Sequence, residues 1–549
     1  MFLKKTKSSG HTYLQITQSY RDGDTPRHKV LLNLGRLDQL QDDASFKGMV
    51  VKLAELVQLQ MSENEDVFSL GQVKGQQVLN WGYVVYQKLW RKFGLDLFFS
   101  KLQGVLNLQY DLGTTVFFEV ANHLLQPCSK RAGYCKREQY AGLEPPEDLN
   151  AYYRCLDVLA ENKESIEQHI FERNLSLFNM HVDVVLYDVT TFHFESVQED
   201  ELKRFGFSKA GKPNEVQVVL GLLVDTEGRP VGYELFSGNT FDAKTLERVL
   251  EGLKSRFRLG KVIVVADRGI NSKMNLKMLK DKGYGYVMAS RLKSMPQKVQ
   301  QEAKDRSQGW IKDASGLEYK VLSFTNAVRD VPAKQTYALA ERVVVTYSEK
   351  RRKKDACDRE RLVAKAQKLL EKPSSIQAQF KRGGKKYLAQ VKEAKGSRWF
   401  LNEKAIAQDQ QWDGLYAIQS SELELDAKRI VEIYHELWRI EESFRVMKST
   451  LEVRPIFHWT PKRIEGHFVM CFLAFLLERT LEWLAREHEI EATPEKMKEA
   501  LNSLQLCSVS YQHQDYYLKM QGDKLGNQLV RMLRIKPPAN VSRKKDWKI

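Results

Sequence analysis

Two short apolar runs near the middle of the chain, each ending in an aspartate, place the strongest limit on its fold. Residues 184–188 read Val-Val-Leu-Tyr-Asp, and residues 262–267 read Val-Ile-Val-Val-Ala-Asp. Apolar runs of this length predict buried strands. Further strand runs and a helical run lie between them, and strands that alternate with helices predict a mixed α/β sheet over residues 182–292.

The rest of the chain divides into segments with other patterns. Alternating apolar and polar residues around Tyr13 and Val30 predict a hairpin at the start. We expect the following order: a small β-rich segment at 1–45, a helical domain at 46–180, the first part of an α/β core at 181–294, a basic β-rich insertion at 295–405, the second part of the core at 406–490, and a C-terminal region with a basic tail at 491–549.

The composition is strongly basic. There are 86 Lys and Arg against 70 Asp and Glu, a formal charge of +16. Such an excess favours a polyanionic partner, although it would also serve solubility alone. The six cysteines are scattered without a CxxC pair, so neither a disulfide framework nor a zinc site is expected, and a reducing cytoplasm fits. No run reaches the ~20 apolar residues of a membrane span, and we expect no membrane contact.

One predicted helix carries three polar residues at a regular spacing. Apolar residues recur at three- and four-residue intervals over residues 427–450, which predicts a long amphipathic helix. Tyr434, Glu441 and Lys448 follow at seven-residue steps, so at about 3.6 residues per turn they project from nearly one face. The alternative is a tyrosine in the core beside two ordinary surface charges.

Three carboxylates in these segments are candidate metal ligands. Asp188 would lie in or beside the sheet, where a carboxylate is costly unless it is paired, hydrogen-bonded or bound to metal; a turn aspartate is the alternative. Asp267 would follow the end of a strand, where α/β sheets bind ligands, or would cap the next helix or pair with Arg268. Glu441 would complete a site for two Mg²⁺ ions, which suits phosphoryl transfer on nucleic acid.

Other residues near these motifs have simpler interpretations. We expect His193, His435 and His467 to be structural rather than metal ligands, because none has a histidine four residues away on a helix. Trp438 is expected in the core rather than as a wedge that stacks on a base. The run from Lys350 to Lys354 is equally consistent with a solvated loop and with a DNA contact.

Together, these motifs resemble those of bacterial DDE transposases of the insertion-sequence four group. That group's signature is a Tyr, an Arg, a Glu and a Lys on one helix, and Tyr434, Glu441 and Lys448 match it in register. Leu437 stands where the arginine is expected, and Arg439 and Arg445 on the same helix could partly substitute. Similar segments occur at 207–213, 216–222, 238–240 and 463–467.

The resemblance implies an α/β, RNase H-like catalytic core interrupted by a β-rich insertion and preceded by the small β segment and the helical domain. The helical domain at 46–180 would bind DNA, and the C-terminal region at 491–549 would serve dimerisation. Asp188, Asp267 and Glu441 would be the catalytic residues and the ligands of two Mg²⁺ ions, for which Mn²⁺ can substitute. Tyr434, Lys448, Arg445 and Arg439 would contact DNA. The implied partners are double-stranded DNA of the transposon terminal repeats and of the target, and a second copy in a homodimer, in the bacterial cytoplasm at the nucleoid.

The implied reaction cuts the DNA backbone at the transposon ends and joins the freed 3′-hydroxyl to target DNA. In this family the hydroxyl can first attack the opposite strand to form a hairpin. Two alternatives stay open at this point. A metal-dependent, structure-specific nuclease on the same core would cut DNA without joining it, and an inactive DNA-binding protein derived from a transposase would bind without cutting.

Overall fold

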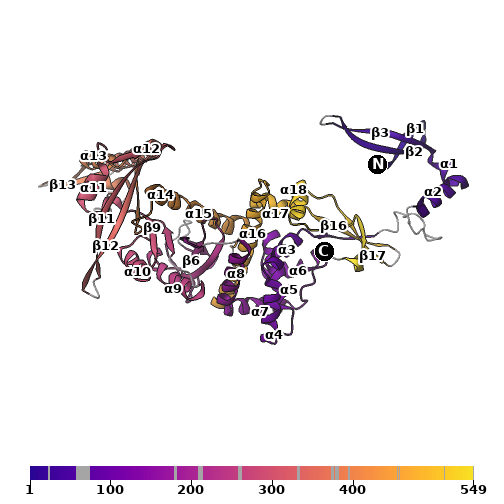
Figure 1. Cartoon of the computed structure of the whole chain (residues 1–549), viewed down its shortest axis with the longest axis horizontal. Helices are drawn as coiled ribbons and strands as arrows, with labels where there is room; N and C mark the ends of the chain where they lie inside the picture. The colour runs from indigo at the N-terminus through magenta and orange to yellow at the C-terminus, as the bar shows by residue number, and fades with distance from the viewer. Residues whose placement is uncertain are drawn as a thin grey trace. The chain divides into compact units, whose positions relative to one another are not determined.

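A computed structural model describes the 549-residue chain except for residues 23–24, 57–73, 179–181, 208–213, 258–261, 331–333, 372–375, 377–382, 394–395, 454–455, 457, 512–513 and 548–549. The described residues form two compact units. The first comprises Met1–Gln76 with Val509–Asp515, and the second comprises Gln77–Ser508 with Tyr516–Ile549. Figure 1 shows their elements.

The first unit is built on a three-stranded antiparallel sheet in the order β1-β2-β3. The strands are β1 (Phe2–Ser8), β2 (His11–Asp22) and β3 (Thr25–Arg36), followed by α1 (Leu37–Asp42) and α2 (Ala44–Leu56). The predicted β-rich segment is therefore present, with one strand more than a hairpin. The tip between β2 and β3 lies outside the described residues.

The second unit begins with helices that share a hydrophobic core with a helix near the C-terminus. Helix α16 (Pro461–Glu487) packs on α5 (Leu112–Leu125) and α7 (Leu149–Glu161), and most of its residues are buried. The remaining helices of this region are α3 (Val84–Lys92), α4 (Leu95–Val105), α6 (Lys130–Cys135) and α8 (Lys163–Phe178). Residues 46–180 are mainly helical, as predicted; α2 belongs to the first unit, and α3, α5 and α7 pack on α16.

A small four-stranded sheet is formed by strands from distant parts of the sequence. Strand β4 (Lys74–Asn80) is hydrogen-bonded next to β16 (Gln505–Tyr511), which is followed in the sheet by β17 (Gln514–Lys519) and β18 (Val541–Arg543). The helices α17 (Pro494–Asn502) and α18 (Lys524–Met532) lie between these strands in the sequence. The C-terminal region thus contributes to the fold beside residues from the first hundred.

The central element is a nine-stranded mixed sheet in the order β10-β11-β12-β15-β9-β8-β5-β6-β7. Strand β5 pairs in parallel with β8, β8 pairs in parallel with β9, and β5, β6 and β7 form an antiparallel meander. The strands are β5 (Val184–His193), β6 (Gln217–Val224), β7 (Pro230–Ser237), β8 (Ile263–Ala266), β9 (Gly285–Ala289), β10 (Trp310–Lys312), β11 (Glu318–Asp330), β12 (Gln335–Tyr347) and β15 (Leu415–Ser420). The mixed α/β sheet predicted from the sequence is present.

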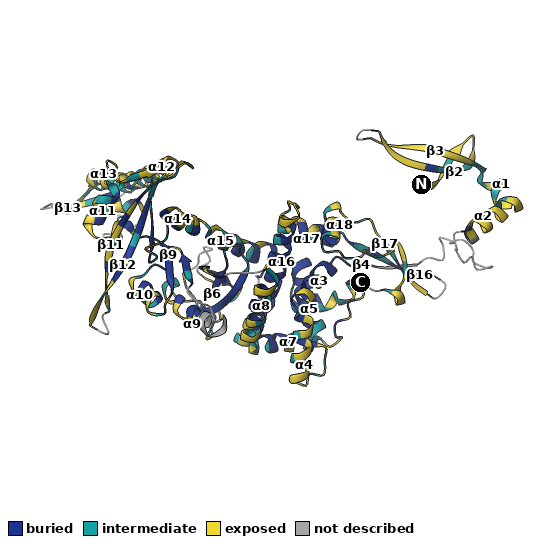
Figure 2. Ribbon diagram, viewed as in Figure 1, coloured by how far each residue is buried: buried dark blue, intermediate teal, exposed yellow. Residues whose placement is uncertain are grey.

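Successive side chains along β5 enter two different cores, as the alternation of a strand requires. Leu186 belongs to the core shared with α14 to α16, whereas Tyr187 belongs to the core under α9 (Leu246–Phe257) and α10 (Lys273–Asp281). Both faces of the sheet are therefore covered by helices. Figure 2 shows the dark, buried strands of this sheet between more exposed helices.

The segment 295–405, expected to be a β-rich insertion, combines strands with helices. Strands β10 to β12 extend the central sheet, and the most basic stretch forms the 22-residue helix α12 (Glu349–Leu370). Ser348 caps this helix by accepting a hydrogen bond from the Arg351 backbone N–H, and no Gly or Pro interrupts it. The run from Lys350 to Lys354 is thus helical and not a loop. The rest of the segment includes α11 (Gln297–Lys304), η5 (Gly383–Tyr387), β13 (Leu388–Glu393), β14 (Gly396–Leu401) and α13 (Glu403–Gln410).

Within the described ranges, none of the helices combines the length and the apolar composition needed to traverse a lipid bilayer.

Candidate active site

Asp188 and Asp267 occupy neighbouring parallel strands at corresponding positions. Tyr187 on β5 is opposite Ala266, the last residue of β8, and the two aspartates are the next residues along each chain segment. Because Leu186 and Tyr187 alternate between the two cores, Asp188 lies on the face of Leu186, toward α15. The Asp188 Oδ1 accepts a hydrogen bond from the Val189 backbone N–H at 2.7 Å. The structure therefore brings these two predicted residues together.

Asp267 is exposed and takes neither of the structural roles that the sequence left open. The cap of α10 is Ser272, whose hydroxyl accepts a hydrogen bond from the Asn275 backbone N–H at 3.2 Å. Arg268 instead lies 6.0 Å from the centre of the Tyr416 ring. Within the described residues, the Asp267 carboxylate has no hydrogen bond or ion pair, which leaves its oxygens available to a ligand.

The signature segment is not the single helix expected over residues 427–450. It consists of α14 (Ala427–His435), α15 (Trp438–Arg445) and the π-helical turn η6 (Val446–Thr450). At the junction the Leu437 N–H donates to the Tyr434 carbonyl at 3.2 Å, the tighter bonding of a 3₁₀ turn. The Leu451 N–H closes the π turn on the Val446 carbonyl at 2.9 Å. The apolar periodicity did not reveal the 3₁₀ junction or the π turn, because the apolar residues stay buried on both sides of each irregular turn.

Tyr434 and Lys448 both reach the sheet from this segment. The Tyr434 hydroxyl lies 2.5 Å from that of Tyr416 on β15, and burial raises the pKa of Tyr434 well above its usual range. The Lys448 Nζ donates a hydrogen bond to the Thr190 hydroxyl. Thr190 is two residues beyond Asp188 and therefore on the same face of β5. Lys448 is thus held beside the first aspartate.

Glu441 is exposed on α15, which packs on β5 and β6. Carboxylate oxygens suit Mg²⁺, so the three residues fit such an ion by their chemistry. In geometry the set is incomplete. In the part of the chain that the structure describes, no three His, Cys, Asp or Glu side chains are grouped closely enough to hold a metal ion. Asp188 and Asp267 follow each other across two neighbouring parallel strands, and Glu441 lies on the helix that packs on β5.

The neighbours of Glu441 differ in their access to a ligand. Leu437, where the resemblance expects an arginine, has only 9% of its surface exposed and belongs to the core. The Arg439 side chain is 15% exposed, and its Nε donates to Glu436 at 2.6 Å. Arg445 is 73% exposed and lies 3.5 Å from Glu442. Trp438 is 49% exposed, so the expectation that it belongs to the core is wrong.

Burial of the three predicted structural histidines varies. His193 and His467 are buried, whereas His435 is exposed. His467 lies among the rings of His123 and His458, and burial lowers the pKa of His123 and of His458 to about 3. Of the segment 207–213, residues 208–213 lie outside the described residues.

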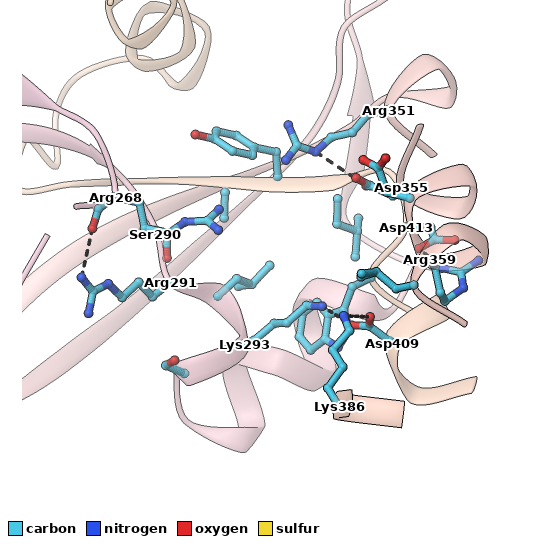
Figure 3. A pocket seen from close by; sticks show the side chains of 18 of the residues that line it. Arg268, Ser290, Arg291, Lys293, Arg351, Asp355, Arg359, Lys386, Asp409 and Asp413 are labelled. Atoms are coloured by element: carbon cyan, nitrogen blue, oxygen red, sulfur yellow. Dashed lines mark hydrogen bonds and ion pairs between the residues drawn. The ribbon is translucent and has the colours of Figure 1, made fainter. Parts of the chain in front are cut away.

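A cavity of about 490 Å³ opens beside Arg268, and the sequence did not reveal it. Its walls come from the strand ends of the central sheet, from α12 and from the residues around α13. Figure 3 shows Arg268 and Arg291 on one side and Lys293, Asp409 and Lys386 on another. Arg291 donates to the Arg268 carbonyl at 3.1 Å. Five separated segments of the chain supply the lining residues of this cavity. The sequence therefore gave no sign of it apart from the basic run that forms α12.

A buried arginine connects the signature segment to the rest of the unit. Arg479 on α16 is 1% exposed, and its Nη1 donates to Glu482 at 2.7 Å. Its Nη1 and Nη2 also donate to Glu442 on α15 at 3.3 Å, and its Nε donates to the Gly228 carbonyl at the same distance. The residue after Glu441 is thereby tied to α16 and to the turn between β6 and β7.

Comparisons with known proteins match two parts of the chain. A family model described as "Transposase DDE domain" matches residues 182–477, more than half of the sequence. A second, "IS1634 family transposase, N-terminal domain", matches residues 3–62. No curated protein matches. A solved structure described as the cryo-EM structure of piggyBac transposase synaptic complex with hairpin DNA is 10% identical, with 77% of this chain and 80% of that chain covered and a TM-score of 0.35, too low to indicate a shared fold.

Proposed function

The chain belongs to the DDE-domain transposases, and from that premise we propose that Asp188, Asp267 and Glu441 are its catalytic carboxylates. It is an insertion-sequence transposase, and its family comprises enzymes that cut and join DNA. The proposal concerns which residues perform this chemistry, with which ions, and which of them hold the DNA.

One observation carries the assignment: the parallel register of β5 and β8 ends in two adjoining aspartates. Asp267 has its carboxylate in solvent, and Lys448 is hydrogen-bonded two residues beyond Asp188. Asp188 is partly buried beside a second carboxylate, and a bound cation would offset the repulsion between the two charges. Structural roles do not account for the exposed carboxylate of Asp267.

Asp188 and Asp267 would hold divalent ions, Mg²⁺ or Mn²⁺, and Glu441 would join them when DNA is bound. When bound, a pair of such ions stabilises the attacking and the leaving oxygen of a phosphoryl displacement. The protein's own residues would orient the DNA. Lys448 would neutralise a phosphate beside Asp188, and Tyr434 would contact the backbone.

Arg445 would contribute a further phosphate contact, because its guanidinium is largely in solvent. Arg439 would contribute less than the sequence suggested, because its Nε is already bound to Glu436. Leu437 lies in the core, so an arginine there would not restore the missing signature residue without disturbing the packing.

We further assign the five strands β7-β6-β5-β8-β9 to an RNase H-like core of the insertion-sequence four type. The support is the strand order with β5 at its centre, the antiparallel meander on one side and the parallel strands on the other. The Tyr434, Glu441 and Lys448 spacing supports the same group. A dimer is proposed because two element ends must be brought together.

The test uses the purified chain, Mg²⁺ and a labelled duplex that ends in the element's terminal repeat. The variants are Asp188→Asn, Asp267→Asn and Glu441→Gln, which keep side-chain size and remove charge. Glu432→Gln, an exposed glutamate on α14, is the matched control. We expect cleavage to be lost in the three variants with DNA binding retained, and to persist in the control.

The products separate the alternatives. Joining of the freed 3′ end to a second duplex distinguishes transposition from simple nuclease activity. Retention of cleavage by any of the three variants would remove that residue from the triad. Binding without cleavage by the parent chain would favour an inactive DNA-binding protein.

A further inference from the structure

We propose that Arg351, in the first turn of α12, is a positioning residue of the active site that binds a backbone phosphate of the element end beside Asp267. The inference rests on the proposed catalytic role of Asp267 and adds a residue from outside the signature segment. It connects the basic helix α12 to the reaction centre.

The first turn of α12 is held against β15, the strand that carries Tyr416. Thr346 on β12 is opposite Tyr416, and α12 follows β12 almost directly. The Ser348 N–H donates to the Gly414 carbonyl at 3.0 Å, and the Gly414 N–H donates to the Asp355 Oδ2 at the same distance. Gly414 has a φ of 82°, and a Cβ there would lie 3.0 Å from the Ser348 carbonyl oxygen, so this close approach favours a glycine.

Arg351 lies over the ring of Tyr416. The carbon of its guanidinium is 4.4 Å from the centre of the ring, within the range of a cation–π contact. The side chain is 43% exposed, and its Nε lies 3.7 Å from the Asp355 Oδ2, longer than a hydrogen bond. Within the described residues, its Nη1 and Nη2 atoms have no partner. A guanidinium held by its face in this way leaves its N–H groups to a phosphate.

Tyr416 connects this arginine to the active site. Its hydroxyl lies 2.5 Å from that of Tyr434. Arg268, the residue after Asp267, lies 6.0 Å from the centre of the Tyr416 ring. Burial is the main cause of the raised pKa of Tyr416, the charge of Asp267 adds to it, and the charges of Arg268 and Arg351 oppose it. All three charges are therefore close enough to act on one hydroxyl group.

The cavity beside Asp267 has a surplus of guanidinium groups. Arg268, Arg291 and Arg351 line it, as Figure 3 shows. Within the described ranges, neither Arg268 nor Arg291 has an ion pair. A phosphate would offset the repulsion between these like charges. Other acidic residues of the cavity are paired with other bases: Asp409 with Lys293 and Lys386, and Asp413 with Arg359.

The signature segment itself presents no free guanidinium next to Tyr434. Leu437, three residues later, belongs to the core, and the Arg439 Nε is bound to Glu436 at 2.6 Å. Arg351 therefore brings a guanidinium to Tyr416, the hydrogen-bond partner of Tyr434, from a different helix.

The test asks whether one phosphate accounts for the effect of Arg351. Arg351→Ala is compared with Arg361→Ala, an arginine of the same helix whose ion pair with Asp358 is also 3.7 Å long. Binding is measured by fluorescence anisotropy without divalent ions. The duplexes carry the terminal repeat, and single phosphates near the cut are replaced in turn by uncharged methylphosphonates. Arg351→Lys, which keeps the charge, guards against a folding defect.

We expect Arg351→Ala to weaken binding of the unmodified duplex about tenfold, and less than about twofold when the methylphosphonate occupies the contacted position. Arg351→Lys should reveal the same position with a smaller loss, because lysine lacks the fork of N–H groups. Arg361→Ala should reveal no such position. An equal loss at every position, an equal loss in Arg361→Ala, or unchanged binding by Arg351→Ala would overturn the inference.

Two comparisons separate the inference from its neighbours. Unchanged binding of the repeat by Arg351→Ala, with a loss only in joining to a second duplex, would overturn it in favour of a contact to target DNA. In an Asp188→Asn background the dependence on one phosphate should persist, because this assay needs no cleavage. Cleavage by Asp188→Asn would therefore refute the proposed triad and leave the phosphate contact of Arg351 standing.

Discussion

Replacing Arg479 should destabilise the second unit and loosen the segment that carries Glu441. The side chain is 1% exposed and bonds to Glu482, Glu442 and the Gly228 carbonyl. Removing one partner of a buried ion pair costs about 3–5 kcal/mol, because the other charge is left unpaired. For Arg479→Ala we expect a loss of about this size at pH 8, when Glu482 is charged.

The loss should shrink as the pH falls. Burial raises the pKa of Glu482 to about 7 in the presence of Arg479, and removing the guanidinium raises it further. Below that pKa the stranded carboxyl binds a proton and becomes neutral. Each pH unit on this slope changes the stability by about 1.4 kcal/mol, so Arg479→Ala should be milder at pH 6 than at pH 8.

Urea denaturation followed by tryptophan fluorescence measures this effect selectively. All nine tryptophans lie in the second unit, so the signal reports that unit alone. Arg479→Met/Glu482→Gln is the control, because replacing both partners leaves no buried unpaired charge and should recover at least half of the loss. A single variant within about 1 kcal/mol of the parent at pH 8, or a double variant no more stable than the single one, would refute the reasoning.

Three further outcomes are expected. Leu437→Arg should not raise cleavage and should lower the free energy of unfolding by about 2 kcal/mol or more, because it places a charge in the core; higher cleavage at unchanged stability would contradict this. Arg445→Ala should weaken DNA binding and lower its salt dependence by about one ion without altering stability, whereas Arg439→Ala should chiefly reduce stability; reversed effects in anisotropy and denaturation would contradict the assigned roles. The clustered histidines should contribute a loss of stability as the pH falls below about 6.5, because burial holds their folded-state pKa below the unfolded value and protonation therefore favours unfolding; the raised pKa of Glu482 acts in the opposite direction. Relative to the parent chain, Asn or Gln in place of these histidines should raise the urea midpoint more at pH 4.5 than at pH 6.5, and an equal change at both pH values would exclude them as the cause: His123, His458 and His467.

Local pattern was sufficient for features that depend on neighbours in the sequence. The apolar runs before Asp188 and Asp267 identified two strands of the central sheet, because an uninterrupted apolar stretch of that length is stable only when buried. The first unit's alternation likewise predicted strands. The spacing of Tyr434, Glu441 and Lys448 indicated a DDE transposase, and its helical period was correct between the two irregular turns.

Features that depend on packing between distant segments were not predictable. The local sequence did not distinguish a basic loop from the helix α12. It also did not show that β10 to β12 extend the central sheet, because the pairing of strands depends on the surface that they bury together. Trp438 was expected in the core, yet it is half exposed at the first residue of α15.

The sequence by itself therefore determined the kind of chemistry: carboxylates after buried strands, a basic chain, and the signature residues of a DNA-joining enzyme. Only the tertiary structure decided the neighbours of each group. It placed Asp188 and Asp267 next to a register pair of two parallel strands, Lys448 on the Thr190 hydroxyl two residues beyond Asp188, and Glu441 on the helix that packs on β5. Residue types set which interactions are available, whereas the burial of apolar surface sets which residues meet.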